Sequence, residues 1–294
     1  MDSVRPDGRS SEAFRPLRVA LGVLERADGS SLLSLGETRV LVSVYGPLQS
    51  ELSTRSGGVA VQTPREGTCQ VTWLEPEPTL SDILTTTREA QRGGVQGAPY
   101  PVLPLSAEQA AVRSRATGLR RHPATETLLE RLFSSVIILM EYASSCIHVI
   151  VQVLHHDGGT LAAAVIAASL ALMDAGVSLR GFLVAVPILA RSIDHEQADV
   201  SWLVDPTLAE LRQQSLGSSL WVVDQTGNIC YCRLEAPFAL GTSAPASLSD
   251  TNASMYLEWH QDAYRIAAGA AEKLCSWLRS VMESQIKDAL PEIQ

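Results

Sequence analysis

The chain has 294 residues, of which 46% are hydrophobic and 19% are charged, and its formal net charge is −9. This composition excludes a disordered or low-complexity chain and is typical of a folded protein with a sizeable core. The negative net charge also argues against a protein that coats nucleic acid through its overall charge alone.

The basic residues, the N-terminal sequence with the apolar runs, and the cysteines each add an expectation. Of the 23 basic residues, 21 are Arg and two are Lys; Arg binds phosphate or carboxylate better than Lys, although a GC-rich genome gives the same bias. The polar start, MDSVRPDGRS, lacks the pattern of a secretory signal, and no apolar run reaches the ~20 residues of a membrane span. The five scattered cysteines predict reduced thiols, and Cys230 and Cys232 are interpreted as packing residues because no second pair or histidine completes a zinc site.

The first third of the chain has the pattern of β-strands. Residues 17–45 alternate apolar runs with turn signals at Asp28-Gly29 and Gly36-Glu37, which predicts an antiparallel meander of three strands. More strand sequence follows at 59–63 and 69–74.

Residues 75–125 are rich in proline and glycine and predict a long surface insertion. The end of this segment, VRSRATGLRRH, is the most basic stretch of the chain. Two interpretations stay open for it: a solvated face, or a contact for RNA or for an acidic neighbour. The candidate contact residues are Arg113, Arg115, Arg120 and Arg121.

From residue 126 the apolar period becomes helical. One buried stripe is predicted from residues three and four positions apart, namely Leu128, Leu132, Phe133, Val136, Ile137 and Met140. Residues 146–154, CIHVIVQVL, then predict a strand. His155 and His156 follow it and are interpreted as loop or edge residues, because neighbours on a strand point in opposite directions.

The stretch HHDGGTLAAAVIAASLALMDAG, residues 155–176, is the strongest local signal. It predicts a buried helix over 158–175 that opens on Asp-Gly-Gly-Thr and closes at Gly176 in a left-handed C-cap. A glycine-rich helix start is a natural seat for phosphate, because free backbone N–H groups point outward there. However, Leu161 follows at once, and no basic residue occurs before Arg180.

Strands and a hairpin dominate the region after this helix. Strands are predicted at 179–189 and up to Asp205, and a polar loop at 191–199 separates them. A hairpin is predicted to join 218–223 to 228–234.

The chain then reads as a small, polar linker at 238–253 and a long amphipathic helix at 255–289. The order of all these elements predicts an α+β fold, with a mixed sheet and helices on one side of it. Residues 1–294 are expected to form one domain.

Three stretches of this chain carry a family resemblance. The first holds Arg-x-Asp-Gly-Arg at 5–9, Ala-Asp-Gly-Ser at 27–30 and Gly-x-Thr-x-Val-x-x-x-Val-Tyr-Gly-Pro at 36–47. The second is VQVLHHDGGTLAAAVIAASLALMDAGVSLRG at 151–181, and the third is LVDPTLAEL at 203–211. In order and spacing they resemble the RNase PH family, and specifically the RNase PH-like subunits of the eukaryotic exosome.

The resemblance implies the ribosomal protein S5 domain 2-like (RNase PH-like) sandwich and the family's chemistry. Active members degrade RNA by phosphorolysis, in which inorganic phosphate attacks the 3′-terminal linkage and releases a nucleoside diphosphate. The family holds phosphate with Gly-Thr-Arg at a helix start and holds the RNA backbone with arginines. A carboxylate pair handles the proton and charge, or positions a metal, near the leaving oxygen.

Carried over by position, the family's phosphate loop corresponds to Gly158, Gly159 and Thr160. The arginine that would clamp phosphate with two hydrogen bonds is replaced by Leu161. A second family arginine, before the preceding strand, falls within Ala143-Ser144-Ser145 and is also lost.

The carboxylates and the RNA-binding arginine are only partly retained. Asp205 matches the first family carboxylate, whereas the second falls at Leu211, with Glu210 beside it. Arg131 lies near a family RNA-binding arginine. Asp205 and Glu210 are therefore candidates for a vestigial catalytic pair.

We therefore expect a subunit that is not an enzyme: a ring component of the exosome that scaffolds the assembly and guides RNA. The implied partners are other RNase PH-like chains in a six-membered ring, S1/KH cap subunits and RNA, in the nucleus and nucleolus and also in the cytoplasm. No metal, cofactor or membrane contact is expected. One alternative is a divergent 3′ exoribonuclease, phosphorolytic or metal-dependent, that uses Asp205 and Glu210 within a heterodimer. A further alternative is a homodimeric RNA-binding protein outside any exosome.

Overall fold

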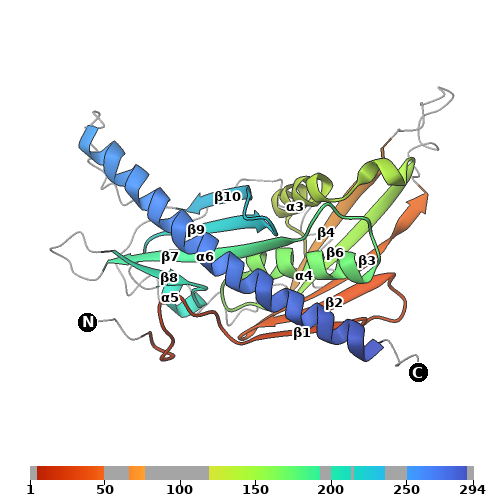
Figure 1. The fold of residues 1–294 in the computed structure, drawn as a ribbon, viewed down its shortest axis with the longest axis horizontal. Coiled ribbons are helices and arrows are strands. Elements are labelled where there is room, and N and C mark those ends of the chain that lie inside the picture. The colour runs from red at the N-terminus through yellow and green to blue at the C-terminus, as the bar shows by residue number, and fades with distance from the viewer. Residues whose placement is uncertain are drawn as a thin grey trace.

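The structure is a computed structural model that describes residues 5–49, 66–76, 119–192, 200–212, 215–235 and 250–289. In this part of the chain, ten strands form two sheets, and helices pack against them (Figure 1). The α+β class expected from the sequence is confirmed.

The first sheet is mixed and has the strand order β1-β2-β3-β6-β4-β5. Its strands are β1 (Leu17–Leu21), β2 (Gly29–Leu35), β3 (Thr38–Gln49), β4 (Thr68–Pro76), β5 (Leu119–Arg120) and β6 (Ser145–His155). β1, β2 and β3 form the predicted antiparallel meander, whereas β4 and β6 run parallel. The strand predicted at 59–63 lies outside the described residues.

The second sheet is antiparallel and has the order β10-β9-β7-β8, a separation that the sequence pattern did not reveal. Its strands are β7 (Leu183–Ser192), β8 (Val200–Val204), β9 (Ser215–Asp224) and β10 (Ile229–Glu235). β9 and β10 form the predicted hairpin. The strand expected at 179–189 begins later, at Leu183, because Leu179 makes only an isolated bridge with Ile137.

Helix α4 (Thr160–Asp174) joins the two sheets into one core. It packs on β2 and β3 of the first sheet and on β7 of the second (Figure 1). Every residue from 162 to 172 is buried, which is the arrangement expected of a helix that is apolar all round. The helix gives way to Gly176 at φ +67°, the left-handed conformation predicted for that glycine.

Helix α3 (Pro123–Val136) covers the edge of the first sheet at β4. The Glu126 carboxylate accepts a hydrogen bond from the Trp73 N–H at 2.9 Å, and Glu130 accepts one from the Val71 N–H at 3.1 Å. These carboxylates satisfy backbone donors of β4 beyond the two residues of β5. Residues 119–125, expected inside the surface insertion, are thus part of the fold, and residues 77–118 of that segment lie outside the described residues.

The buried stripe predicted on this helix ends before Met140. Ile137 adopts an extended backbone (φ −70°, ψ 137°) and ends α3, so Met140 falls on the short 3₁₀ helix η2 (Leu139–Tyr142). Its side chain is 71% exposed, and the prediction of a buried Met140 was therefore wrong. Leu132, Phe133, Val136 and Ile137 are buried as predicted.

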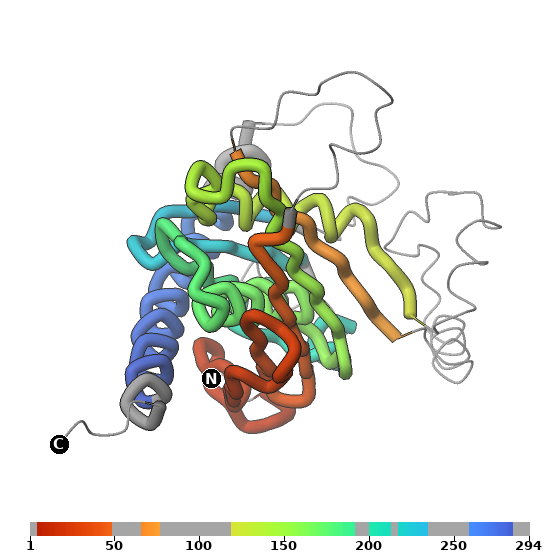
Figure 2. The backbone as a smooth tube through the Cα atoms, turned by 90° about the vertical axis from the view of Figure 1, so that its right-hand side faces the viewer, coloured from red at the N-terminus to blue at the C-terminus, as the bar shows by residue number. Residues whose placement is uncertain are grey.

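Helix α6 (Asp250–Ala289) runs across the second sheet and contacts β7, β8 and β9. It stands at one side of the molecule in the turned view (Figure 2). Its buried residues are spaced three or four apart, as in Ala263, Ala267, Ala270 and Leu274. No helix of the described residues combines the length and the apolar character that crossing a membrane requires.

Candidate functional site

The loop between β6 and α4 has a backbone that favours glycine at two successive positions. Gly158 and Gly159 have φ values of +84° and +65°, and Gly159 is the N-cap of α4. A Cβ atom on Gly158 would lie 2.7 Å from the Pro206 carbonyl oxygen, and one on Gly159 would lie 3.1 Å from Nη2 of Arg15. The glycines therefore allow the loop to approach both the β8–α5 connection and the N-terminal segment.

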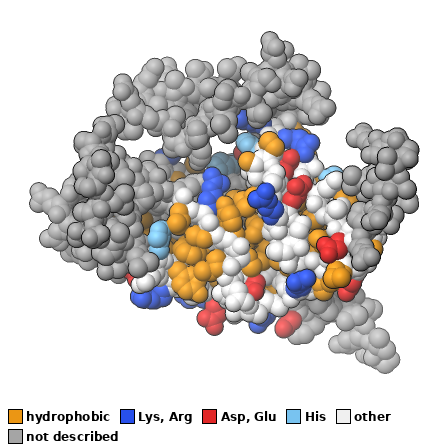
Figure 3. All heavy atoms as spheres, turned by 90° about the horizontal axis from the view of Figure 1, so that it is seen from above, with side chains coloured by type: hydrophobic (Ala, Val, Ile, Leu, Met, Phe, Trp, Pro, Cys, Tyr) orange, Lys and Arg blue, Asp and Glu red, His pale blue; other side chains and the backbone are white. Residues whose placement is uncertain are grey.

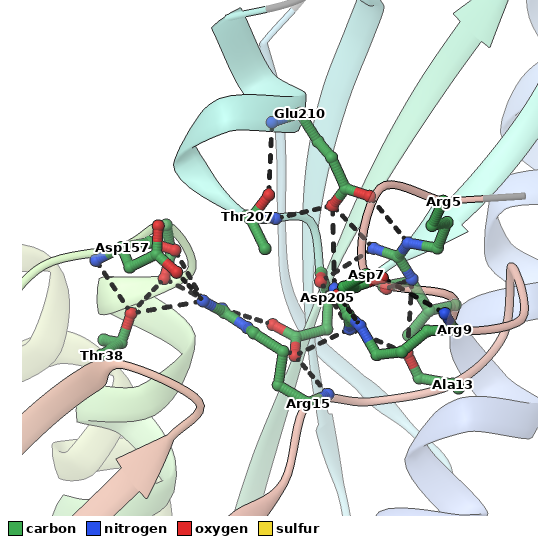
Figure 4. A network of polar contacts seen from close by, with 12 residues as sticks. Arg5, Asp7, Arg9, Ala13, Arg15, Thr38, Asp157, Asp205, Thr207 and Glu210 are labelled. Atoms are coloured by element: carbon green, nitrogen blue, oxygen red, sulfur yellow. Dashed lines mark hydrogen bonds and ion pairs between the residues drawn. The ribbon is translucent and has the colours of Figure 1, made fainter.

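Arg15 holds this loop from the N-terminal side. Its guanidinium donates to the carbonyl oxygen of Asp157 at 2.6 Å and to that of Gly158 at 3.1 Å. The Thr38 hydroxyl donates to the same Gly158 oxygen at 2.8 Å. The carbonyl oxygens of Asp157 and Gly158 are thus satisfied within the chain, as the contacts of Arg15 and Thr38 beside Asp157 show (Figure 4).

Asp205 is the second anchor of Arg15. It follows β8, its side chain is fully buried, and its φ is +52°, a conformation that aspartate adopts more easily than most residues. One carboxylate oxygen accepts from the Arg15 backbone N–H and from Nε, both at 2.9 Å, and the other accepts from Nη2 at 2.7 Å. The pair joins residues 190 positions apart in the sequence.

Glu210 and Arg5 form a second buried ion pair beside the first. Arg5 donates to both carboxylate oxygens of Glu210, at 2.8 and 2.9 Å, and its side chain is 1% exposed. Burial raises the pKa of Glu210, but hydrogen bonds from Arg5 and from the Thr207 N–H, with the charges of Arg5 and Arg9, outweigh it and leave the pKa below its ordinary value. Glu210 lies on the short helix α5 (Leu208–Arg212) and is ionised in the folded chain at neutral pH.

Arg9 is the third arginine of this cluster. It pairs with Asp7 and lies 3.8 Å from both Asp205 and Glu210. Its Nη2 is buried and has no hydrogen-bond partner among the described residues. The N-terminal segment, the loop before α4 and the β8–α5 connection thus meet in one network of charged groups (Figure 4).

The sequence pattern identifies Asp205, Glu210 and the glycine loop as site residues but not their partners. Arg5 and Arg9 belong to the N-terminal family motif without a role assigned to them, and nothing in the sequence distinguishes Arg15. No local spacing could have paired them, because the contacts span about two thirds of the chain: the separations are 190 residues for Arg15 with Asp205 and 205 for Arg5 with Glu210.

The predicted contact arginines fall in different places. Arg121 precedes α3 and donates to both oxygens of Glu126 at 2.8 Å, whereas Arg120 pairs with Glu75 of β4 through the backbone of β5. Arg131 is exposed on α3. Arg113 and Arg115 lie outside the described residues.

A groove of about 640 Å³ opens next to the charged network. It begins at Asp157 and Thr207 and continues over the outer face of the first sheet. There the strand register places Arg18, Ser34 and Arg39 side by side on β1, β2 and β3. The site is thus open to solvent on the side of the β1–β3 meander.

Within the described ranges, no group of three or more His, Cys, Asp or Glu side chains could hold a metal ion. All five cysteines are free, and Cys230 is exposed, so it does not act as the packing residue that we expected. Cys232 is half-buried and packs against the core. His155 contacts the backbone oxygen of Glu37, and His156 contacts the Thr160 hydroxyl.

Comparison with known proteins places the chain in a known sequence family. The model of the 3′ exoribonuclease family, domain 1 (RNase PH), matches residues 13–178. The exosome complex component Rrp41 of Pyrobaculum aerophilum is 31% identical over 187 residues, which cover 64% of this chain and 62% of the relative. Rrp41 of Archaeoglobus fulgidus is 29% identical over 71% of this chain and 65% of the relative. The chain therefore spans less than two thirds of the length of these curated relatives.

Solved structures show the same fold. The crystal structure of rice (Oryza sativa) Rrp46 has a TM-score of 0.57 at 21% identity, with 92% of this chain and 99% of that chain covered. The Archaeoglobus fulgidus exosome with RNA bound to the active site gives a TM-score of 0.57 at 19% identity, with 94% and 93% covered. The expected RNase PH-like fold is confirmed.

These matches contradict the expectation, drawn from Leu161, that the chain is not an enzyme. The family that matches is one of 3′ exoribonucleases, and the similar curated proteins are Rrp41 components. The physical reason for the error is that one position does not set the charge of this site. Arg5, Arg9 and Arg15 reach the same region from the N-terminal segment, and the balance between them and their carboxylates sets that charge.

Proposed function

The chain belongs to the 3′ exoribonuclease (RNase PH) family, and we propose that it is an RNase PH-like exosome subunit that acts on RNA from the 3′ end. The observation that supports this most directly is the meeting of the Gly158–Thr160 loop with Asp205 in one network. In the family these two segments hold the attacking phosphate and a carboxylate. The match over residues 13–178 includes the loop.

Within the proposed site, Asp205 and Glu210 anchor the arginines that shape the loop. Both carboxylates are buried, and each accepts two or more hydrogen bonds from an arginine. Deep burial and full pairing suit a group that fixes geometry better than one that contacts a long polymer. RNA would then approach from the open side, where the groove with Arg18 and Arg39 begins.

A second RNase PH-like chain is part of the proposal. The described residues expose seven large hydrophobic side chains, namely Val23, Leu48, Met140, Leu154, Ile229, Leu234 and Tyr264. Figure 3 shows one face on which hydrophobic side chains gather in several patches, with basic and acidic residues among and around them. Apolar surface with charged residues around it is typical of protein interfaces.

For the whole assembly, we propose a six-membered RNase PH-like ring with S1/KH cap subunits, in the nucleus, nucleolus and cytoplasm.

The motifs at 172–181 and 203–211 favour the Rrp46 type of ring subunit within this assembly. Arginines near the RNA path would contact phosphates, because such contacts position a strand without reading its bases. Arg18 and Arg39 line that path in the groove, whereas Arg120 lies on β5 at the opposite edge of the sheet, and Arg121 is already held by Glu126.

The test uses the full chain co-purified with its RNase PH-like partner, a 3′-labelled single-stranded RNA, and buffers with and without phosphate. We expect phosphate-dependent release of labelled nucleoside diphosphate. Arg18→Ala, in the groove, should weaken RNA binding by a similar factor for all sequences and lower the salt slope by about 1. Arg265→Ala, an exposed arginine of α6, is the matched control and should change neither quantity.

Two results would contradict the proposal. One is a chain that co-purifies with no RNase PH-like protein. The other is a complex that neither binds RNA nor releases any nucleotide from its 3′ end. Release of nucleoside monophosphate without phosphate would keep the 3′ exoribonuclease assignment and replace phosphate by water as the nucleophile.

A further inference from the structure

His156 occupies a special position beside the Gly158–Thr160 loop. It follows β6 directly, and its Nδ1 contacts the Oγ1 of Thr160, the first residue of α4. It is thus four residues before Thr160 and faces the side chain that the loop would offer to a bound anion. Its neighbour His155 turns to the backbone oxygen of Glu37 instead.

The loop needs a cation that the chain does not supply from the expected position. Leu161 is partly buried against the core and carries no charge. Arg15 reaches the loop, but Asp205 at 2.7 Å and Asp157 at 3.4 Å balance its charge. Backbone N–H groups at an exposed helix start favour an anion by only about 0.3–1 kcal/mol.

Protonation of His156 changes what Thr160 can do. An unprotonated Nδ1 accepts the Thr160 hydroxyl proton, which is then unavailable to a ligand. In the imidazolium form Nδ1 is always a donor, so it donates to the Thr160 oxygen and leaves the hydroxyl proton free for an anion. The same protonation places a positive charge at the loop.

The surroundings of His156 decide which form prevails without a ligand. Burial lowers the pKa of His156, and the charges of Glu75 on β4 and of Asp157 raise it, while His155 and Arg15 lower it; the net pKa is below the ordinary value. Glu75 is itself held by His122, which precedes α3, at 3.0 Å. With a pKa below the ordinary value, His156 is mostly uncharged at neutral pH when no anion is bound.

We propose that His156, in its protonated form, supplies the cation that position 161 lacks, so that the Gly158–Thr160 loop takes up one proton when it binds a phosphate dianion. The inference rests on the proposed function, which places the attacking phosphate at this loop. His156 contacts Thr160 in the structure, and it acts on the ligand through this hydroxyl and through its charge. It is thus a positioning residue.

The experiment measures anion binding to the full chain as a function of pH. Sulfate is the probe, because it stays doubly charged between about pH 5 and 8, a range in which phosphate groups take up a proton. As pH rises from the pKa of His156 in the sulfate-free chain to its pKa in the sulfate-bound chain, we expect sulfate affinity to fall about tenfold per pH unit. In NMR, the ring signal of His156 should titrate at higher pH when sulfate is present.

Three variants make the test specific. His156→Asn keeps a polar group near Thr160 but cannot be protonated, so the pH dependence should disappear and affinity should stay at its high-pH level. His156→Lys keeps a charge over the whole range and should bind sulfate tightly even at high pH. His155→Asn is the matched control and should retain the wild-type slope of affinity against pH, displaced to higher pH because the charge of His155 lowers the pKa of His156.

The inference is overturned if His156→Asn retains the pH dependence, if His155→Asn removes it, or if sulfate leaves the His156 titration unmoved. This outcome differs from failure of the proposed function. A complex that degrades RNA but shows no proton-linked sulfate binding would contradict only the role of His156. A complex that shows proton-linked sulfate binding but does not degrade RNA would contradict only the proposed function.

Discussion

The substitution Asp205→Asn tests whether the buried charged network holds the site together. Asn has the shape of Asp and tolerates the φ of +52° found at this position, so the change removes a charge and little else. It leaves the Arg15 guanidinium, whose side chain is 4% exposed, without its main counter-ion.

The expected cost follows from the geometry of the pair. Removing one partner of a buried ion pair typically costs ~3–5 kcal/mol, because the other charge stays buried and unpaired. The amide oxygen of the substituted side chain would still accept one or two of the three hydrogen bonds that Arg15 donates, so we expect the lower end, about 3 kcal/mol. In the double variant Arg15→Met/Asp205→Asn both charges of the buried pair are gone, and only the partly exposed Asp157 loses a partner, so the two costs should fall short of additive by about 2 kcal/mol.

The assay is urea denaturation followed by fluorescence, with the midpoint and slope measured for each variant. Glu12→Gln provides the control, because Glu12 and Lys273 form a pair at 3.0 Å whose side chains are 63% and 65% exposed. Such a pair contributes less than about 1 kcal/mol. A cost below about 1 kcal/mol for Asp205→Asn, or full additivity with Arg15→Met, would refute the network as the anchor of the loop.

Three further expectations concern other parts of the site and the core. Gly159→Ala should lower the free energy of unfolding by about 1–2 kcal/mol because of its φ of +65°, and by a further amount because the added Cβ approaches Arg15. Gly176→Ala, with φ +67° and open space around it, should lose only the first part. Equal losses in the denaturation midpoints of the two variants would argue against the close approach at Gly159. The pKa of Glu210 lies below its ordinary 4.5 because the hydrogen bonds from Arg5 and the Thr207 N–H outweigh burial. The ionised Glu210 therefore stabilises the fold above pH 4.5, and this stabilisation is lost as pH falls through the pKa of the folded chain. In a plot of unfolding free energy against pH, Glu210→Gln should flatten the acid side, and an unchanged acid side would contradict the pairing. Burial raises the pKa of Cys69 to about 12, so iodoacetamide at about pH 8 should label the exposed Cys230 first and Cys69 only after unfolding. Peptide mass spectrometry measures the two labelling rates, and equal rates would exclude a buried Cys69.

Local patterns predicted those parts of the fold whose cause is local. The signal at 36–37 places the tight turn between β2 and β3, where Gly36 has a φ of +58°. The signal at 28–29 marks the end of the longer β1–β2 connection, because Gly29 is already the first residue of β2. The apolar composition of 162–172 predicts a buried helix without saying what covers it. Met140 shows the limit, because the helical period continues through it while the backbone leaves the helix at Ile137.

The site was less predictable because its contacts are distant in sequence. The glycines of the loop can be recognised from spacing, since their left-handed φ values need glycine. Arg15 carries no such signal: on its own it resembles any arginine before a strand. Its importance comes from Asp205, which the fold brings to within 2.7 Å from 190 residues away.

The balance of charge in this cluster explains why Leu161 alone led to the wrong prediction that the chain is not an enzyme. It also explains why a proton on His156 affects anion binding. Three arginines of the N-terminal segment face four carboxylates, those of Asp7, Asp157, Asp205 and Glu210, so the paired network keeps a net negative charge. The charge of the site thus depends on these seven groups together, and the absence of an arginine at 161 alone does not decide activity. A dianion that enters such a cluster must bring or attract positive charge, because an uncompensated charge in a partly desolvated site is costly. A proton on His156 is a source of that charge that the folded chain places beside Thr160.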